Sequence, residues 1–340
     1  MRAGSNPFKR AKIVNSPSPV TVALLAHIPF EHGYFRESLD VLKLCLQSIY
    51  ANTTAISYDI LVFDNGSARP VVDFLINEQR EGRIQYLALS GTNIGKAAAL
   101  NFMLGAAPGE YIAYSDSDVF FFPGWLEAHI KILETFPRVG IVNGLPARHL
   151  TDWATESTLA IARESPDIQI ETGQLIPSDI IASRCEGVGR QLEDDVQEYG
   201  ALEDIRLTCN EVQAYVGAHH FQFVARKNVL QKIGPLQVTA PLHNRDDRQF
   251  DQALDAAGYM RLAAASQYVF HLGNVLTPKW RQVAEEYAVP VRPVSQVSGS
   301  VAGMQRLKHR MREHPAVKRV LLKLYGGIFD LYYGGRKHEF

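Results

Sequence analysis

Apolar segments alternate with amphipathic ones along the first 120 residues. Four mostly apolar segments are predicted to be strands: residues 20–26, 59–63, 84–89 and 110–114. The first is a continuous apolar run, typical of a strand buried on both faces, and the second is also predicted to be buried. Between them, apolar residues recur at helical spacing, which predicts helices at 38–52, 71–80 and 95–104. Because strands that are separated by helices usually pair in parallel, this pattern predicts an α/β fold with a mostly parallel sheet flanked by helices.

The pattern is weaker in the second half of the chain. Between Glu186 and Glu211 there are eight acidic residues and two arginines, so we expect a loop-rich insert with short helices over 149–212. Strand-like and helical patterns then return: a strand-like stretch at 212–226, helices at 227–233 and 248–257, and a last strand within 262–271. Gly258 is the residue expected to end the second of these helices.

The two ends of the chain differ from this central part. Residues 1–19 hold three prolines and four basic residues without an apolar period, so we expect a flexible arm there. One domain is predicted over 20–275. A Pro-, Ser- and Val-rich stretch indicates a linker or mobile loop within 276–300, and a basic helical extension follows at 301–340.

Composition limits the class of protein. The chain has 340 residues, of which 46% are apolar and 21% charged, enough to form a sizeable core. Since the chain has 35 basic and 36 acidic residues, a uniformly basic nucleic-acid binder is not expected. Three scattered cysteines indicate reduced thiols rather than disulfides or a zinc site. Without an apolar secretory segment or a run of about 18 apolar residues, we expect a cytoplasmic protein with no spanning helix.

The charge is concentrated at the C-terminal end. Residues 306–340 hold nine Lys and Arg and three Asp and Glu, a local charge of +6. A basic amphipathic helix can lie on an anionic membrane, where each basic residue is worth roughly 1 kcal/mol. The 301–340 segment would then hold the protein peripherally on the inner face of the membrane. The alternative is a helix packed on the domain or on a second copy in a homodimer.

Polar clusters follow the predicted strands, at the edge where α/β sheets bind ligands. They are Asp64, Asn93 and the pair Asp116 and Asp118. In a strand, residues i and i+2 point the same way, so the paired carboxylates can meet one cation. Mg²⁺ or Mn²⁺ commonly binds through one or two carboxylates together with substrate phosphates. We therefore expect a metal that neutralises a diphosphate leaving group, although a solvated turn explains most isolated Asp-x-Asp sequences.

As a set, these motifs resemble those of GT-A fold glycosyltransferases of family 2. The matching segments, in that family's order and spacing, are 64–67, 93–101, 115–118, 123–126, 217–218, 226–234, 246–247 and 257–259. The resemblance covers about 18–275, with a diverged middle at 149–212. It implies a GT-A fold with a Rossmann-like, mostly parallel sheet, a nucleotide-sugar-binding half at 20–125 and an acceptor half at 213–275.

The resemblance implies roles for the first set of residues. Asp64 would read the nucleotide base, although an Asx turn is its structural alternative. Asn93 and Lys96 would line the nucleotide, with Lys96 offsetting diphosphate charge unless it is a solvated lysine at a helix start. Asp116 would face the ribose and, together with Asp118, the metal.

A second set would serve the metal and the acceptor. His271 would be a further metal ligand, because neutral imidazole is a suitable donor, or else a structural histidine. The residues that would shape the acceptor pocket are Gly217, Ala218, His219 and His220. For the two histidines, simple packing is the alternative.

Transfer of a sugar to a hydroxyl needs a base that takes the acceptor proton. In the family this base is an acidic residue ahead of a helix that ends in Ala-Gly-Tyr, and here that register selects Asp247. Asp246 beside it would orient the acceptor hydroxyl, and two such close charges raise one pKa, which suits a base. The alternative is that these acids only cap a helix N-terminus. The family's usual second Asp is Gln249 here, which leaves the acceptor contact open.

Together these features predict an inverting, Mn²⁺- or Mg²⁺-dependent glycosyltransferase. Its donor would be a nucleotide diphosphate sugar, in this family most often a UDP-sugar, and its acceptor a hydroxyl of a glycan or lipid-linked sugar in polysaccharide, glycan or glycolipid synthesis. The alternatives are a retaining GT-A glycosyltransferase and a non-catalytic carbohydrate-binding or scaffold protein. No G-x-G-x-x-G motif follows a strand, which argues against an NAD-dependent enzyme.

Overall fold

The computed structural model describes residues 16–238 and 245–289, with the side chains of 245–247 left aside. Most of the predicted N-terminal arm, the predicted linker from residue 290 onward and the basic extension at 301–340 lie outside the described residues. The predictions of a membrane-bound or dimer-forming tail therefore stay predictions. Among the described residues, no helix is long and apolar enough to cross a bilayer.

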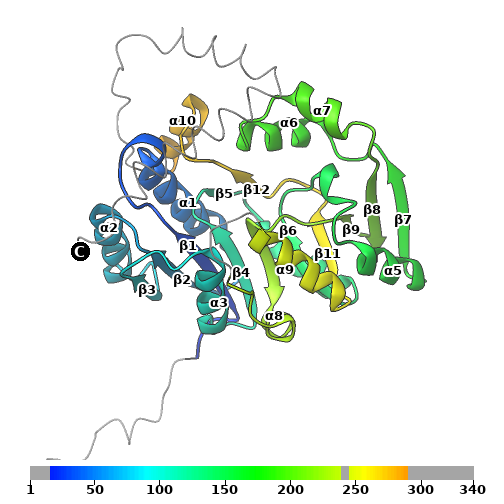
Figure 1. The fold of residues 1–340 in the computed structure, drawn as a ribbon, viewed down its shortest axis with the longest axis horizontal. Helices are drawn as coiled ribbons and strands as arrows, with labels where there is room; N and C mark the ends of the chain where they lie inside the picture. Colours follow the sequence, from blue (N-terminus) through cyan, green and yellow to red (C-terminus); the bar gives the residue numbers. More distant parts are fainter. Residues whose placement is uncertain (1–15, 239–244, 290–340) are drawn as a thin grey trace, which may run out of the picture. The chain divides into compact units, whose positions relative to one another are not determined.

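A ten-stranded sheet runs through the domain in the order β3-β2-β1-β4-β10-β6-β11-β9-β8-β7 (Figure 1). Its first four strands are parallel and follow the predicted segments: β1 Val20–Ala26, β2 Tyr58–Asn65, β3 Tyr86–Ser90 and β4 Tyr111–Asp116. The helices between them are α1 Ser38–Asn52, α2 Arg69–Arg80 and α3 Lys96–Ala106. Every residue of β1 is buried, as expected for a strand covered on both faces.

The second half of the sheet is mixed. It comprises β6 Val139–Asn143, β7 Ile168–Gly173, β8 Asp204–Cys209, β9 Val212–Val216, β10 Gln222–Arg226 and β11 Met260–Ala264. Only β6 and β11 pair in parallel there, and the other neighbours are antiparallel. The tight turn at Asn210 and Glu211, both at positive φ, makes β8 and β9 a hairpin. The α/β class with flanking helices is confirmed, and the parallel order is concentrated at β3-β2-β1-β4.

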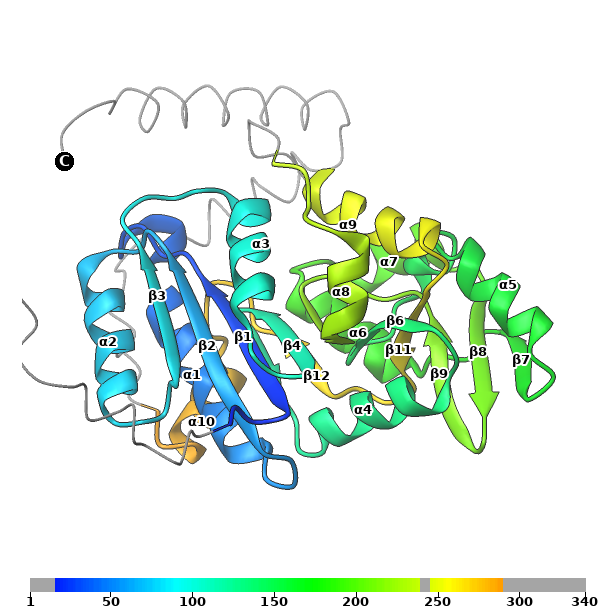
Figure 2. The same ribbon diagram turned by 90° about the horizontal axis from the view of Figure 1, so that it is seen from below.

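Helices cover both faces of the sheet (Figure 2). The apolar residues of α1, α2 and α4 Trp125–Thr135 pack in one core with one face of β1, together with residues of α5 Glu156–Glu164 and α6 Ser178–Gly187. Those of α3, α8 Lys227–Ile233 and α9 Arg245–Ala256 pack in a second core with the other face. Gly258 has φ +72° two residues after the last residue of α9, as predicted for a glycine that follows a helix end.

A separate two-stranded sheet pairs β5 Val119–Phe121 with β12 Val269–His271 in antiparallel fashion. The single strand predicted within 262–271 is therefore two strands, because the chain leaves β11 in the main sheet and pairs again with β5. The register places His271 opposite Val119, the residue that follows Asp118. This small sheet thus brings His271 close to Asp118, and both are predicted metal ligands.

The short helices predicted for the insert at 149–212 are present, whereas the prediction that it is rich in loops is wrong. The segment contains α5 Glu156–Glu164, β7, α6 Ser178–Gly187, α7 Leu192–Tyr199 and β8, and its two strands extend the main sheet. A 3-10 turn at Arg148–Leu150 begins it. Its acidic residues are not all solvated: Asp204 is buried and accepts hydrogen bonds of 2.9 and 3.0 Å from Arg148. The acidic composition therefore did not predict the exposure of these residues, because a buried acid can be paired with a distant arginine.

The prediction that a linker begins at residue 276 is also wrong. Residues 278–286 form helix α10 Pro278–Glu286, with the proline in its first turn, where a missing N–H costs nothing. Trp280 is buried and its ring lies 4.9 Å from that of Phe120 and 4.5 Å from that of Phe270. This aromatic contact holds α10 against the two-stranded sheet, so 276–289 belongs to the domain.

Candidate active site

The loops after β1, β2 and β3 are tied together by amide and imidazole groups. Asn65 donates a 3.0 Å hydrogen bond to the side-chain oxygen of Asn93 and accepts one of 2.9 Å from the backbone of Ile94. His27, directly after β1, has its Nδ1 2.8 Å from the Asn65 carbonyl and its Nε2 3.2 Å from the Asn93 amide. Asn93 therefore helps to shape the loop, and its predicted contact with a nucleotide stays a prediction. The sequence suggested no such role for His27 or Asn65.

Asp64 lies at the buried end of β2. Its Oδ2 accepts a 3.1 Å hydrogen bond from the backbone N–H of Ser67, which is the Asx turn considered as its structural alternative. Its Oδ1 is also buried, yet within the described part of the chain it has no hydrogen-bond partner. One carboxylate can thus hold the turn and still offer an acceptor to a ligand. At Gly66, φ is +79° and an added Cβ would lie 2.8 Å from the Asn93 nitrogen, so this close approach of loops requires glycine.

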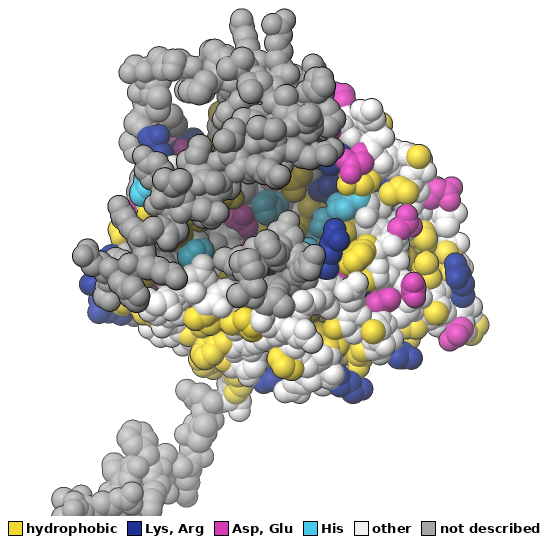
Figure 3. All heavy atoms as spheres, viewed as in Figure 1, with side chains coloured by type: hydrophobic (Ala, Val, Ile, Leu, Met, Phe, Trp, Pro, Cys, Tyr) yellow, Lys and Arg dark blue, Asp and Glu magenta, His cyan; other side chains and the backbone are white. Residues whose placement is uncertain are grey.

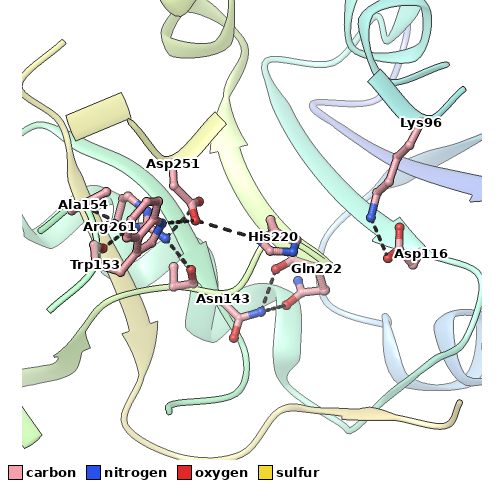
Figure 4. A network of polar contacts seen from close by, with 10 residues as sticks. Lys96, Asp116, Asn143, Trp153, Ala154, His220, Gln222, Asp251 and Arg261 are labelled. Carbon is pink, nitrogen blue, oxygen red and sulfur yellow. Dashed lines mark hydrogen bonds and ion pairs between the residues drawn. The ribbon is translucent and has the colours of Figure 1, made fainter. Parts of the chain in front are cut away.

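Lys96 and Asp116 are brought together across the site (Figure 4). Lys96 begins α3, and its Nζ lies 3.1 Å from Oδ2 of Asp116 at the end of β4. The hydroxyl of Tyr114 donates to the other carboxylate oxygen of Asp116. Both side chains of the ion pair are partly buried, with 29% and 25% exposure, so Lys96 is not a freely solvated lysine. This places a cationic group beside the first acid of the predicted metal motif.

Asp118 and His271 form the second close pair of the site. His271 Nε2 lies 3.5 Å from Asp118 Oδ2, and its Nδ1 lies 3.2 Å from the carbonyl of Gly187 at the end of α6. Burial raises the pKa of Asp118; His271 opposes this shift and the charge of Asp116 adds to it. Asp118 Oδ1 is buried without a hydrogen-bond partner among the described atoms. A desolvated carboxylate with an unpaired oxygen beside an imidazole is a suitable place for a cation.

The predicted metal set is only partly assembled. No group of three or more His, Cys, Asp or Glu side chains within 16–238 and 248–289 is arranged to hold a metal. Asp118 and His271 face each other, whereas Asp116 is engaged by Lys96 and Tyr114. The donor types fit Mn²⁺ or Mg²⁺, with the remaining ligands left to phosphate oxygens and water.

The residues predicted to shape the acceptor pocket lie between β9 and β10. Gly217 has φ +94°, and an added Cβ would lie 2.7 Å from the carbonyl of Leu150, so glycine allows the insert to approach. Burial lowers the pKa of His219 well below its usual value. His220 Nδ1 lies 3.9 Å from Oδ2 of Asp251, on the inner side of α9 (Figure 4).

A buried arginine organises this side of the site, and none of the sequence motifs includes it. Arg261, in β11, is fully buried and pairs with Asp251 at 2.9 Å. Its guanidinium also donates to backbone carbonyls of three residues in two other segments: Trp153 at 2.6 Å, Ala154 at 3.1 Å and Ala218 at 2.7 Å. The network therefore joins α9, the start of the insert and the loop that precedes His219 (Figure 4). The sequence feature that could have indicated this network is the presence of an arginine inside the apolar run 260–264.

The two candidate bases, Asp246 and Asp247, lie in the first turn of α9. Their side chains are outside the described residues, so the predicted catalytic role stays a prediction. Asp247 lies one helical turn before Asp251, whose carboxylate is fixed by Arg261. The position at a helix start agrees both with a base and with a helix cap.

Comparisons with known proteins agree with the motif resemblance. Residues 34–180 match the family model described as Glycosyl transferase family 2. An uncharacterized glycosyltransferase of Rickettsia bellii is 33% identical over 91 residues, and one of Rickettsia conorii is 33% identical over 78 residues. These alignments cover 26% and 23% of this chain, and they span only 13% of the length of each relative.

Two solved structures are similar at low identity. A mannosyltransferase from Pyrobaculum calidifontis, solved in complex with GDP-Man and Mn²⁺, has a TM-score of 0.42 and 16% identity, covering 74% of this chain and 56% of its own. Residues 1–349 of S. aureus TarS have a TM-score of 0.42 and 13% identity, covering 79% of this chain and 64% of the other.

Proposed function

Because this chain contains a glycosyl transferase family 2 domain, we propose that it transfers a sugar from a nucleotide diphosphate sugar to an acceptor hydroxyl, with inversion and with Mn²⁺ or Mg²⁺. The donor we propose is a UDP-sugar. The observation that carries the proposal is the meeting of three groups at one edge of the sheet: the Lys96–Asp116 ion pair, the Asp118–His271 pair and the unpaired oxygen of Asp64. In α/β sheets, this edge is where ligands bind.

On the donor side, each group has a matching chemical task. Asp64 Oδ1 would accept an N–H of the base. The ammonium of Lys96 would exchange part of its contact with Asp116 for an oxygen of the diphosphate, which as a group carries more negative charge than one carboxylate. Asp118 and His271 would hold the metal, which would neutralise negative charge on the departing diphosphate.

On the acceptor side, Asp247 would take the proton of the attacking hydroxyl. The hydroxyl oxygen forms a bond to the anomeric carbon as the bond to the diphosphate oxygen breaks, and that electron pair leaves with the diphosphate. Attack on the face opposite to the leaving group inverts the anomeric centre. Asp246 would orient the hydroxyl, and the Arg261–Asp251 network would keep α9 at a fixed distance from the sheet.

Donor binding can be tested by thermal stabilisation with UDP-, GDP- and dTDP-sugars, each with and without Mn²⁺. We expect the UDP-sugars to stabilise the protein in a metal-dependent way, and Asp118→Asn to lose the metal-dependent part. Asp73→Asn is the matched control, because that carboxylate is 53% exposed and pairs with Arg69 on the surface of α2. If no nucleotide sugar gives metal-dependent stabilisation, the proposal is wrong.

The base can be tested with Asp247→Asn. This variant should keep donor binding and lose transfer, and NMR of the wild-type product should show the opposite anomeric configuration from the donor. Undiminished transfer by Asp247→Asn would exclude Asp247 as the base. A product with the donor's configuration would instead support a retaining transferase.

A further inference from the structure

Five aromatic and imidazole rings form a continuous row beside the site. Tyr199 lies 5.3 Å from His149, His149 lies 5.4 Å from His219, His219 lies 5.1 Å from Phe221, and Phe221 lies 5.3 Å from His271, measured between ring centroids. In Figure 3, histidine side chains gather beside an acidic side chain in the middle of the face shown. The row therefore begins in the insert and ends at a predicted metal ligand.

The rings come from separate segments of the chain. Tyr199 ends α7 and His149 lies in the 3-10 turn Arg148–Leu150, both at the insert. His219 and Phe221 lie between β9 and β10, and His271 ends β12. None of the five is fully buried, so the row borders the surface rather than the centre of a core.

Two polar atoms in the row lack partners. Nδ1 of His149 and Nε2 of His219 are buried and make no hydrogen bond within the described part of the chain. A buried polar atom without a partner costs about 1–3 kcal/mol, and aliphatic side chains would fill the same space without that cost. In native structures such atoms call for a reason, and a ligand that completes their hydrogen bonds is one.

The chemistry of the two histidines indicates the kind of ligand. Burial, aided by the charge of Arg184, lowers the pKa of His149 to about 4, and burial lowers that of His219 well below its usual value. Both rings are therefore uncharged at neutral pH, and each offers one N–H donor and one lone-pair acceptor. Hydroxyl groups match this combination because they donate and accept, whereas a phosphate would need donors or cations only. Aromatic rings add apolar contact for the C–H faces of a sugar.

We propose that the row from Tyr199 to His271 is a saccharide-binding site that holds the acceptor beyond its reacting sugar, so that the acceptor is a glycan of more than one unit. This inference rests on the proposed function, since the row ends at the Asp118–His271 pair, where the donor would react. The insert would then select the acceptor through Tyr199 and His149, while the β1–β4 edge binds the donor.

The test uses the full chain and uncharged probes: glucose and N-acetylglucosamine, and the trisaccharides maltotriose, cellotriose and triacetylchitotriose. Saturation-transfer NMR measures their binding, and thermal stabilisation by UDP with Mn²⁺ measures donor binding in the same samples. At least one trisaccharide should bind more tightly than its own monosaccharide. Tyr199→Ala should weaken that binding about tenfold, the size of one lost aromatic contact.

Two further variants keep the outcome clear. His149→Gln retains a polar group without the ring and should also weaken trisaccharide binding, while Tyr86→Ala removes an exposed ring from β3 and should not. Donor binding should be unchanged in all three variants. If no trisaccharide binds, or if Tyr199→Ala and His149→Gln bind like Tyr86→Ala, the saccharide site is wrong. If UDP with Mn²⁺ does not stabilise the wild-type protein against heat, that result would instead count against the proposed function.

Discussion

Asp251→Ala should be among the most destabilising single changes near the site. Its carboxylate is 2% exposed and pairs at 2.9 Å with Arg261, which is fully buried. Burial lowers the pKa of Arg261, and the charge of Asp251 is the largest influence that opposes this shift. Removing the carboxylate leaves a buried cation that keeps its backbone carbonyl partners and the smaller electrostatic contribution of Asp255.

The expected magnitude follows from this burial. Breaking a buried ion pair by removing one partner costs about 3–5 kcal/mol, because the remaining charge is desolvated and uncompensated. Arg69 and Asp73 form the matched exposed pair, with 84% and 53% of their side chains exposed. Asp73→Ala should cost about 0–1 kcal/mol, the usual worth of a surface ion pair.

Urea denaturation followed by tryptophan fluorescence gives both free energies of unfolding. The double variant Asp251→Leu with Arg261→Met should recover much of the loss, since apolar residues of similar volume often replace a buried ion pair without cost. If Asp251→Ala costs no more than Asp73→Ala, then Asp251 does not compensate a buried charge. If the double variant is no better than the single one, the carbonyl contacts of Arg261, and not its charge, dominate.

Three further changes test other parts of the structure. Gly66→Ala should lower the unfolding free energy more than Gly82→Ala, measured in urea: both have positive φ, which costs about 1–2 kcal/mol in a non-glycine residue, but only Gly66 meets neighbouring backbone within 4 Å. Burial lowers the pKa of His129 from 6.5 to about 4, so the unfolded chain binds the proton first. Stability should fall as pH drops from about 6.5 to 4, and His129→Gln should flatten this dependence in denaturation at several pH values. Gly187→Ala would place a Cβ 2.6 Å from the His271 carbonyl, so it should weaken Mn²⁺ binding measured by electron paramagnetic resonance.

The first half of the fold could be predicted because three of its four strands, β1, β2 and β4, are mostly buried and therefore mostly apolar. All seven residues of β1 are buried, and six of them are apolar; the hydroxyl of the seventh, Thr21, accepts a 2.8 Å hydrogen bond from the backbone N–H of Gly109. The same apolar runs fix where the strands end, and therefore placed Asp64 and Asp116 at one edge of the sheet. The sequence did not predict the ion pair between Lys96 and Asp116. This pair forms because α3 begins beside the end of β4.

The insert and the final helix could not be predicted for a different reason. Their polar residues are satisfied by partners far along the chain, and composition does not reveal such partners. Asp204 resembles one more acid of an exposed loop until Arg148, 56 residues earlier, is seen to cover it. Arg261 likewise reads as an interruption of an apolar strand, whereas it binds three carbonyls and a carboxylate.

The two proposed substrate sides of the site differ in how far sequence motifs predict them. The proposed donor side is built from strand ends and short loops of the first half, where sequence motifs and spatial position coincide. On the proposed acceptor side, the ring of His219 lies beside that of His149, a residue 70 positions earlier that the motifs do not include. We therefore propose that a change in the insert would alter acceptor binding without altering donor binding, because the insert supplies Tyr199 and His149 and no proposed donor residue. Exchanging the insert should alter the glycan that binds and leave nucleotide binding as it was.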